Sequence, residues 1–216
     1  MFASRCALCG TTDHNALCGT TDHLTLDGGN AYCPDCLEQL APAPVNRCGR
    51  CAAEIGLYAS SDQGCVHCRR RKLRFDGVVC LGMYEGALRK ALLAAKWSFS
   101  AVRMRSLGAL LSIERAMELS AQPFDRIVPV PQHWRQRLVR NFNPAWIIAN
   151  ELASRLNTNC NVHLLKRTSR TRPQKRVSVT QRFENQDGAF AVTHPPAVQG
   201  QRILIVDDVL TTGATC

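Results

Sequence analysis

Four pairs of cysteines constrain the fold of this chain more than any other feature of its sequence. Each pair has the spacing C-x-x-C, and all four lie before residue 70: Cys6/Cys9, Cys33/Cys36, Cys48/Cys51 and Cys65/Cys68. A C-x-x-C turn presents two thiolates to one Zn²⁺, and two such turns complete a tetrahedral site. The eight thiols therefore predict two structural zinc sites. The simplest pairing is sequential, first turn with second and third with fourth, which gives a double zinc ribbon; two other pairings stay open.

A redox dithiol and a disulfide scaffold are the alternatives for these cysteines. No strand-then-helix pattern of the thioredoxin type surrounds any pair, and a reducing cytosol disfavours stored disulfides. Because residues 1–70 are too few and too polar to bury a sufficient core, we expect metal to supply their folding energy. A duplication, in which Leu8–His14 is repeated at Leu17–His23, leaves Cys18 as a copy of Cys9 that could substitute for it.

The length and composition leave room for one ordinary domain and a small one, with 216 residues of which 45% are hydrophobic. The apolar stretches are too short to span a bilayer, and Met1–Thr12 lacks the pattern of a secretory signal, so we expect a cytoplasmic protein without membrane insertion. The net charge of +10 is localised, because residues 121–182 contain twelve Lys and Arg and two acids. This predicts a surface or cleft for a polyphosphate or a nucleic-acid backbone.

The hydrophobic pattern after residue 74 predicts alternating helices and strands. We expect these elements: a strand within Phe75–Tyr84, helices through Leu88–Leu93 and Val102–Met117 interrupted at Trp97–Ser100, a strand at Asp125–Val130, a helix capped by Asn143 that runs to about Leu156, and strands at Val162–Leu165 and Ile203–Val206. Such alternation is typical of an α/β fold with a doubly wound parallel sheet, which binds ligands at the carboxyl ends of its strands.

Ile203–Thr215 (ILIVDDVLTTGAT) is the most specific motif for chemistry. Asp207 and Asp208 follow an apolar strand directly. A turn then offers backbone N–H groups and hydroxyls to a phosphate; its residues are Thr211, Thr212, Gly213, Ala214 and Thr215. Carboxylates beside such a turn suit a sugar phosphate, because they accept hydrogen bonds from ribose hydroxyls.

The motif resembles the signature of the type I phosphoribosyltransferases, and nearly the whole chain is similar to the ComF family of competence proteins, including its GntX type. That family joins a double zinc ribbon to a phosphoribosyltransferase domain. Besides the cysteine pairs, the matching segments are Lys96-Trp97, Val128–Pro131, Arg137–Ala145 (RLVRNFNPA), Thr171-x-x-Gln174, Arg182-x-x-Asn185 and Gly188–Phe190. Asn141 and Pro144 stand where the family has Gly and Gln, and Pro144 removes a backbone donor. The resemblance implies a double zinc ribbon over residues 1–70 and an α/β type I phosphoribosyltransferase domain over residues 71–216.

The resemblance also implies a ligand, phosphoribosyl pyrophosphate with Mg²⁺. Asp207 and Asp208 would hold its ribose hydroxyls, Thr211–Thr215 would hold its 5′-phosphate, and Mg²⁺ would bridge pyrophosphate and ribose. Arg137 and Arg140 would face the pyrophosphate as catalytic cations, and the basic stretch at residues 167–182 would close over it as a flap. A role in DNA uptake for competence, or in the use of external DNA, is implied as well, with single-stranded DNA and competence machinery proteins as partners.

Two functions stay open on the sequence alone. The chain is either an enzyme that transfers phosphoribose to an unknown acceptor, or a non-catalytic zinc-ribbon competence protein that binds DNA. A degenerate or truncated gene product is a form of the second alternative. The sequence ends at Cys216, one residue after the predicted phosphate-binding turn, so we expect the C-terminal helix and last strand of the fold to be missing. We therefore expect the polypeptide as written to be unstable or inactive.

Overall fold

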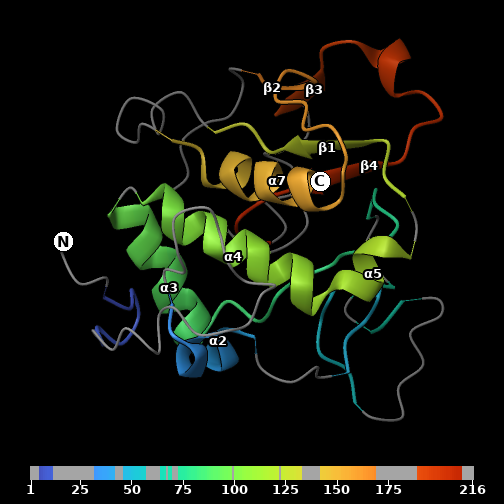
Figure 1. Ribbon diagram of the computed structural model, residues 1–216. Helices are drawn as coiled ribbons and strands as arrows, with labels where there is room; N and C mark the ends of the chain where they lie inside the picture. Colours follow the sequence, from blue (N-terminus) through green and yellow to red (C-terminus); the bar gives the residue numbers. More distant parts are fainter. Residues whose placement is uncertain are drawn as a thin grey trace.

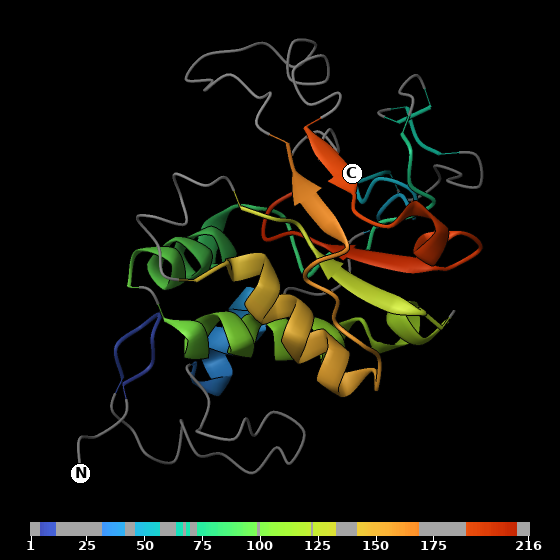
Figure 2. The same cartoon turned by 90° about the horizontal axis from the view of Figure 1, so that it is seen from above.

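The computed structural model describes residues 5–11, 32–41, 46–56, 64–66, 68–69, 73–98, 100–121, 123–132, 142–168 and 189–210. Its elements, in chain order, are α2 (Pro34–Leu40), α3 (Gly86–Trp97), α4 (Ala101–Glu114), α5 (Ala116–Ser120), β1 (Arg126–Pro129), α7 (Pro144–Arg155), β2 (Leu165–Arg167), β3 (Phe190–Val192), the 3-10 helix η1 (Pro195–Val198) and β4 (Ile203–Val206). Helix α7 packs against β1 and β4, α4 packs against α7, and α3 packs against α4 and α2. Figures 1 and 2 show this succession, with the strands on one side of α7 and α4 on the other.

The central strands are parallel, as the alternation of helices and strands predicted. Strand β1 pairs with β4 from Arg126 opposite Ile203 to Pro129 opposite Val206. Ile127 also forms a parallel bridge to Cys160, so the segment after α7 lies on the side of β1 away from β4. Two neighbouring strands thus end at the same edge of the sheet, which is where ligands bind in folds of this class.

Helix α7 begins at the predicted cap. The Asn143 side chain accepts a hydrogen bond from the Ala145 N–H at 3.1 Å and donates to the Val130 carbonyl at 3.0 Å, which ties the helix to the end of β1. Pro144 occupies the first helical position. An N–H group at that position has no partner within the helix, so the missing donor of Pro144 removes no helical hydrogen bond.

Other boundaries follow the prediction less closely. Helix α3 ends at Trp97 and α4 begins after Ser100, whose hydroxyl accepts from the Arg103 N–H at 3.4 Å, so the predicted interruption is confirmed. The strand predicted within Phe75–Tyr84 is wrong, because these described residues form bends and irregular backbone and no strand. Strand β2 begins at Leu165, and it pairs antiparallel with β3 rather than extending the parallel sheet.

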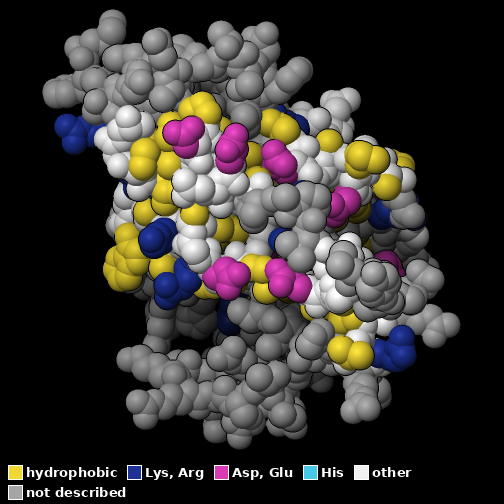
Figure 3. Space-filling view, turned by 90° about the horizontal axis from the view of Figure 1, so that it is seen from below, with side chains coloured by type: hydrophobic (Ala, Val, Ile, Leu, Met, Phe, Trp, Pro, Cys, Tyr) yellow, Lys and Arg dark blue, Asp and Glu magenta, His cyan; other side chains and the backbone are white. Residues whose placement is uncertain are grey.

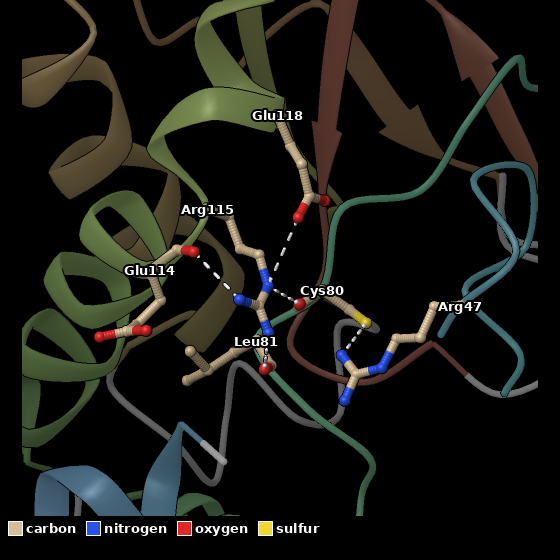
Figure 4. Close-up of polar contacts among 6 residues, drawn as sticks. All are labelled: Arg47, Cys80, Leu81, Glu114, Arg115 and Glu118. Carbon is tan, nitrogen blue, oxygen red and sulfur yellow. Dashed lines mark hydrogen bonds and ion pairs between the residues drawn. The ribbon is translucent and has the colours of Figure 1, made fainter. Parts of the chain in front are cut away.

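Arg115 holds part of this irregular stretch in place (Figure 4). Its guanidinium is buried, and it donates to the carbonyls of Cys80 at 3.0 Å and Leu81 at 3.1 Å. A second arginine, Arg47, donates to the Cys80 sulfur at 3.2 Å from the region of the third C-x-x-C turn. Because buried carbonyls need donors and a buried guanidinium needs acceptors, these bonds fix residues 80–81 against the junction of α4 and α5.

The main hydrophobic core includes part of the cysteine-rich region. Buried Cys6, Cys33 and Leu40 share one cluster with helix residues such as Leu92 and Ile148. The cysteines of the third and fourth turns form a separate, small cluster. The division of the chain at residue 70 stays a prediction. Within the part of the chain that the structure describes, no helix combines the length and the apolar content that a membrane crossing needs.

Candidate functional site

The eight predicted thiols form two groups of four. Cys6, Cys9, Cys33 and Cys36 make the first cysteine group, and Cys48, Cys51, Cys65 and Cys68 make the second; within each group the sulfur atoms lie within 4.8 Å of one another. The turns therefore combine first with second and third with fourth. This is the sequential arrangement, the simplest of the three that the spacing allowed.

The sulfur separations fit a tetrahedral zinc site. With Zn–S bonds of about 2.3 Å, the sulfurs of such a site lie about 3.8 Å apart. Four Sγ–Sγ distances test this geometry: Cys9–Cys33 3.7 Å, Cys48–Cys68 3.8 Å, Cys65–Cys68 3.9 Å and Cys51–Cys65 3.5 Å. All are far longer than a disulfide bond of about 2.05 Å. Each group can therefore bind one Zn²⁺ through four sulfurs.

Backbone N–H groups stabilise one thiolate in each group. Burial tends to raise the pKa of the Cys6 thiol. Hydrogen bonds from backbone N–H groups, including those of Cys9 and Cys33, have the larger combined effect and lower this pKa to about 6. Burial also raises the pKa of Cys48, and the surrounding donors again lower it to about 6. Burial and the neighbouring thiols raise the pKa of Cys36. A cation is thus needed before all four sulfurs of a group can be thiolates together.

Asp207 and Asp208 lie where β4 ends, half-buried beside the end of β1. The Asp208 N–H donates to the Asp207 carboxylate at 2.8 Å. Lys96, near the end of α3, places its Nζ 2.6 Å from a carboxylate oxygen of Asp208, and these two side chains are only 14% and 18% exposed. In the sequence, Lys96 was notable only as part of a family motif. Its contact with Asp208 depends on packing between distant segments, so no local signal could have found it.

The two carboxylates differ in their electrostatics. Burial is the main cause that raises the pKa of Asp207, to about 6, and the charge of Asp208 adds to it. The Asp208 N–H, Lys96 and Arg167 act in the opposite direction. At neutral pH Asp207 is therefore an ionised carboxylate in surroundings that disfavour its charge, and hydroxyl donors from a ligand would relieve this.

Arg167 is the second cation near these carboxylates. It lies at the end of β2 with its guanidinium 5.2 Å from the centre of the Phe190 ring. Burial lowers the pKa of Arg167 and the charge of Asp207 raises it. Among the described residues, its Nε is a buried donor without a hydrogen-bond partner. A guanidinium with a free N–H is well placed to bind an anion.

A cationic cavity adjoins Arg167. It has a volume of about 690 Å³, and its basic lining residues are Arg126, Lys166, Arg167, His163 and His194. No Asp or Glu occurs among the described residues that line it. On the face in Figure 3, by contrast, acidic, basic and hydrophobic side chains are interspersed. The cationic cavity is therefore a local feature that suits an anion.

The remaining predicted site residues lie outside the described part of the chain. These are Arg137, Arg140, Thr211, Thr212, Gly213, Ala214 and Thr215. Of the predicted flap over residues 167–182, only Arg167 and Thr168 are described. The roles assigned to all of these residues stay predictions.

Comparison with known proteins identifies relatives for both halves of the chain. A family model for the phosphoribosyl transferase domain matches residues 144–216. Competence protein F of Haemophilus influenzae is 28% identical over 192 residues, which cover 86% of this chain and 81% of that protein. DNA utilization protein YhgH of Escherichia coli strain K12 is 31% identical over 170 residues, covering 75% and 72%. Its namesake in Salmonella typhimurium is 30% identical over 179 residues, covering 79% and 74%. No solved structure matches the chain.

Proposed function

Because the chain belongs to the ComF family, with a type I phosphoribosyltransferase domain and two four-cysteine groups, we propose that it binds phosphoribosyl pyrophosphate with Mg²⁺ and acts in the use of external DNA. The observation that carries the ligand is the pair Asp207 and Asp208 at the end of β4, held half-buried beside Lys96. Two adjacent carboxylates at this edge of a parallel sheet are suited to the 2′- and 3′-hydroxyls of a ribose.

Each charged end of the ligand has a proposed partner. The turn Thr211–Thr215 would bind the 5′-phosphate through its N–H groups and hydroxyls. The pyrophosphate would lie toward Arg167 and the cationic cavity, together with Arg137 and Arg140. Bound Mg²⁺ would neutralise charge on the pyrophosphate, which makes it a better leaving group. Fixed cations around the leaving group stabilise the charge that develops on it as its bond to the ribose breaks.

We also propose that both cysteine groups hold structural zinc. The tetrahedral separations of the sulfurs support this, and each zinc would contribute about 10 to 16 kcal/mol to folding. The reducing cytoplasm is the location that suits such sites, because it keeps thiols available to metal.

A second candidate function is binding of single-stranded DNA without catalysis. The names of the relatives, competence protein F and DNA utilization protein, favour it, as does the cationic cavity of about 690 Å³. In this function the basic residues of the cavity would contact the phosphate backbone, and competence machinery proteins would be the partners. Such binding weakens steeply with salt, because counterions are released from the nucleic acid.

The two functions are separated by titrating the zinc-loaded chain with Mg²⁺-phosphoribosyl pyrophosphate and with a labelled oligothymidylate over a series of salt concentrations. The first function predicts saturable binding of the sugar phosphate that is lost in Asp207→Asn and Asp208→Asn. Such binding would also contradict the expectation from the sequence that the chain as written is inactive. Asp125→Asn is the matched control, because this exposed carboxylate accepts a hydrogen bond from the Arg202 N–H at 2.7 Å and lies outside the cationic cavity. Salt-sensitive DNA binding without sugar-phosphate binding would favour the second function, and failure of both titrations would contradict both.

A further inference from the structure

A second cavity lies between the second cysteine group and the two carboxylates, and the functions proposed above assign no ligand to its apolar part. Its volume is about 440 Å³, within the range of about 300 to 1,000 Å³ that is usual for small-molecule sites. Cys51 and Cys68 form part of one wall, and Asp207 and Asp208 form part of another. The cavity shares no described lining residue with the cationic cavity.

The lining of this cavity is mainly apolar. Its buried aliphatic residues are Leu81, Leu88, Leu92, Leu107 and Ile148. At the surface, Met83 and Tyr84 are 40% and 39% exposed, so a large thioether and an aromatic ring are available to an entering ligand. Apolar walls with polar groups at one end are typical of sites that bind a ring and orient it.

The charge of the lining is opposite to that of the cationic cavity. Its described residues include three acids, Glu85, Asp207 and Asp208, and no Lys, Arg or His. Lys96, which is not among the lining residues, pairs with Asp208. The other two acids still disfavour an anionic ligand relative to a neutral apolar ring.

The wall that contains residues 78–85 is held in position before any ligand arrives. The Val78 N–H donates to the Gly49 carbonyl at 3.1 Å, beside the second cysteine group. Arg115 donates to the carbonyls of Cys80 and Leu81, as Figure 4 shows. A preorganised wall reduces the entropy that a ligand must lose from the protein on binding.

We propose that this cavity is the acceptor site of the phosphoribosyl transfer, and that it takes a neutral, planar, largely apolar ring; this rests on the proposed function. The ring would place a nucleophilic atom beside the ribose held by Asp207 and Asp208. A lone pair of that atom forms the bond to C1, the bond from C1 to the pyrophosphate oxygen breaks with its electrons leaving on pyrophosphate, and the acceptor's proton passes to water. Acceptor and leaving group thus use cavities of opposite charge.

Indole and indole-2-carboxylate are a matched pair of probes, because they share a ring and differ in charge. The assay is calorimetric titration of the zinc-loaded full chain, with Mg²⁺-phosphoribosyl pyrophosphate measured in parallel. We expect saturable binding of indole, and an affinity for indole-2-carboxylate that is at least about tenfold lower than the affinity for indole. Leu111→Phe, which adds bulk to the cavity, should abolish indole binding and leave the sugar-phosphate affinity unchanged. Ile113→Phe is the control, a half-buried position on the same helix outside the cavity.

Tyr84→Ala is a second variant that keeps the test valid if Leu111→Phe fails to fold, because Tyr84 is an exposed residue of the cavity lining. Loss of its ring should weaken indole binding several-fold. Binding of Mg²⁺-phosphoribosyl pyrophosphate without binding of indole would overturn this inference alone. So would equal affinity for the two probes, or indole binding that both cavity variants leave unchanged. Indole binding without sugar-phosphate binding would instead overturn the proposed function and, with it, the acceptor role.

Discussion

Replacement of Asp207 by Asn is expected to stabilise the fold while it removes the ribose site. The pKa of this carboxyl rises from 3.8 to about 6 in the folded chain, chiefly through burial. Since one pKa unit corresponds to about 1.4 kcal/mol, the ionised carboxylate destabilises the folded state by up to about 3 kcal/mol at neutral pH. An Asn side chain of the same shape carries no charge and escapes this penalty.

The sign of the effect sets its pH dependence. A folded pKa above the unfolded value means that the folded state holds the proton more tightly, so stability declines as pH rises from about 4 to about 6. The wild type and Asp207→Asn should therefore unfold alike near pH 4, and the variant should be more stable by up to about 3 kcal/mol at pH 7.5. Solvent screening of this half-buried group makes that figure an upper bound.

Urea unfolding of the zinc-loaded wild type and variant at several pH values measures the difference in their free energies of unfolding. Any effect of pH on zinc binding is common to the two proteins and cancels in this difference. Asp208→Asn is the control, since it loses the contact with Lys96 at 2.6 Å and should not be stabilised. An Asp207→Asn variant that is no more stable than the wild type at pH 7.5, or whose advantage does not change with pH, would refute the reasoning. A confirmed gain would identify Asp207 as a residue whose placement lowers stability in favour of function.

Three further predictions concern the metal and the two cations that link distant segments. Removal of zinc by a chelator should unfold the cysteine-rich region, because each site would contribute about 10 to 16 kcal/mol to folding. The circular dichroism spectrum should change on chelation and recover when Zn²⁺, but not Mg²⁺, is added. A spectrum that the chelator leaves unchanged would contradict this prediction. Arg115→Met should lower the free energy of unfolding by about 2 to 4 kcal/mol, since it removes the donor to the carbonyls of Cys80 and Leu81. Arg105→Met at an exposed site of α4 should change this free energy little, and equal losses in the two variants would argue against the buried bonds. Lys96→Met should destabilise the chain by about 1 to 3 kcal/mol and weaken sugar-phosphate binding, because it leaves Asp208 without its cation. The control is the same replacement at Lys90, an exposed residue of α3. A binding isotherm identical to that of the wild type would count against a role for Lys96.

Features that depend on neighbours in the chain were predictable from the sequence. The spacing of the cysteines predicted two four-sulfur groups, because a C-x-x-C turn is a local structure that needs no knowledge of the rest of the fold. Asn143 and Pro144 predicted the start of α7, since capping involves residues only a few positions apart. The apolar run at Ile203–Val206 predicted β4 and placed two carboxylates directly after it.

Features that depend on partners far along the chain were not predictable. Residues 75–84 have the composition of a strand, yet a strand requires a neighbour to pair with, and the structure provides Arg115 and Gly49 as partners instead. The direction of β2 was likewise decided by its antiparallel partner β3, which begins at Phe190.

The candidate site divides in the same way. The sequence alone identified the candidate residues, eight thiols and two adjacent carboxylates, because these types and spacings suit zinc and a ribose. Only the tertiary structure decided that Lys96 meets Asp208, that the third and fourth cysteine turns combine, and that an apolar cavity joins that cysteine group to the carboxylates. The physical reason is that packing sets the distances between groups that are remote in sequence. These distances then determine the pKa values of the ionisable groups and their accessibility to a ligand.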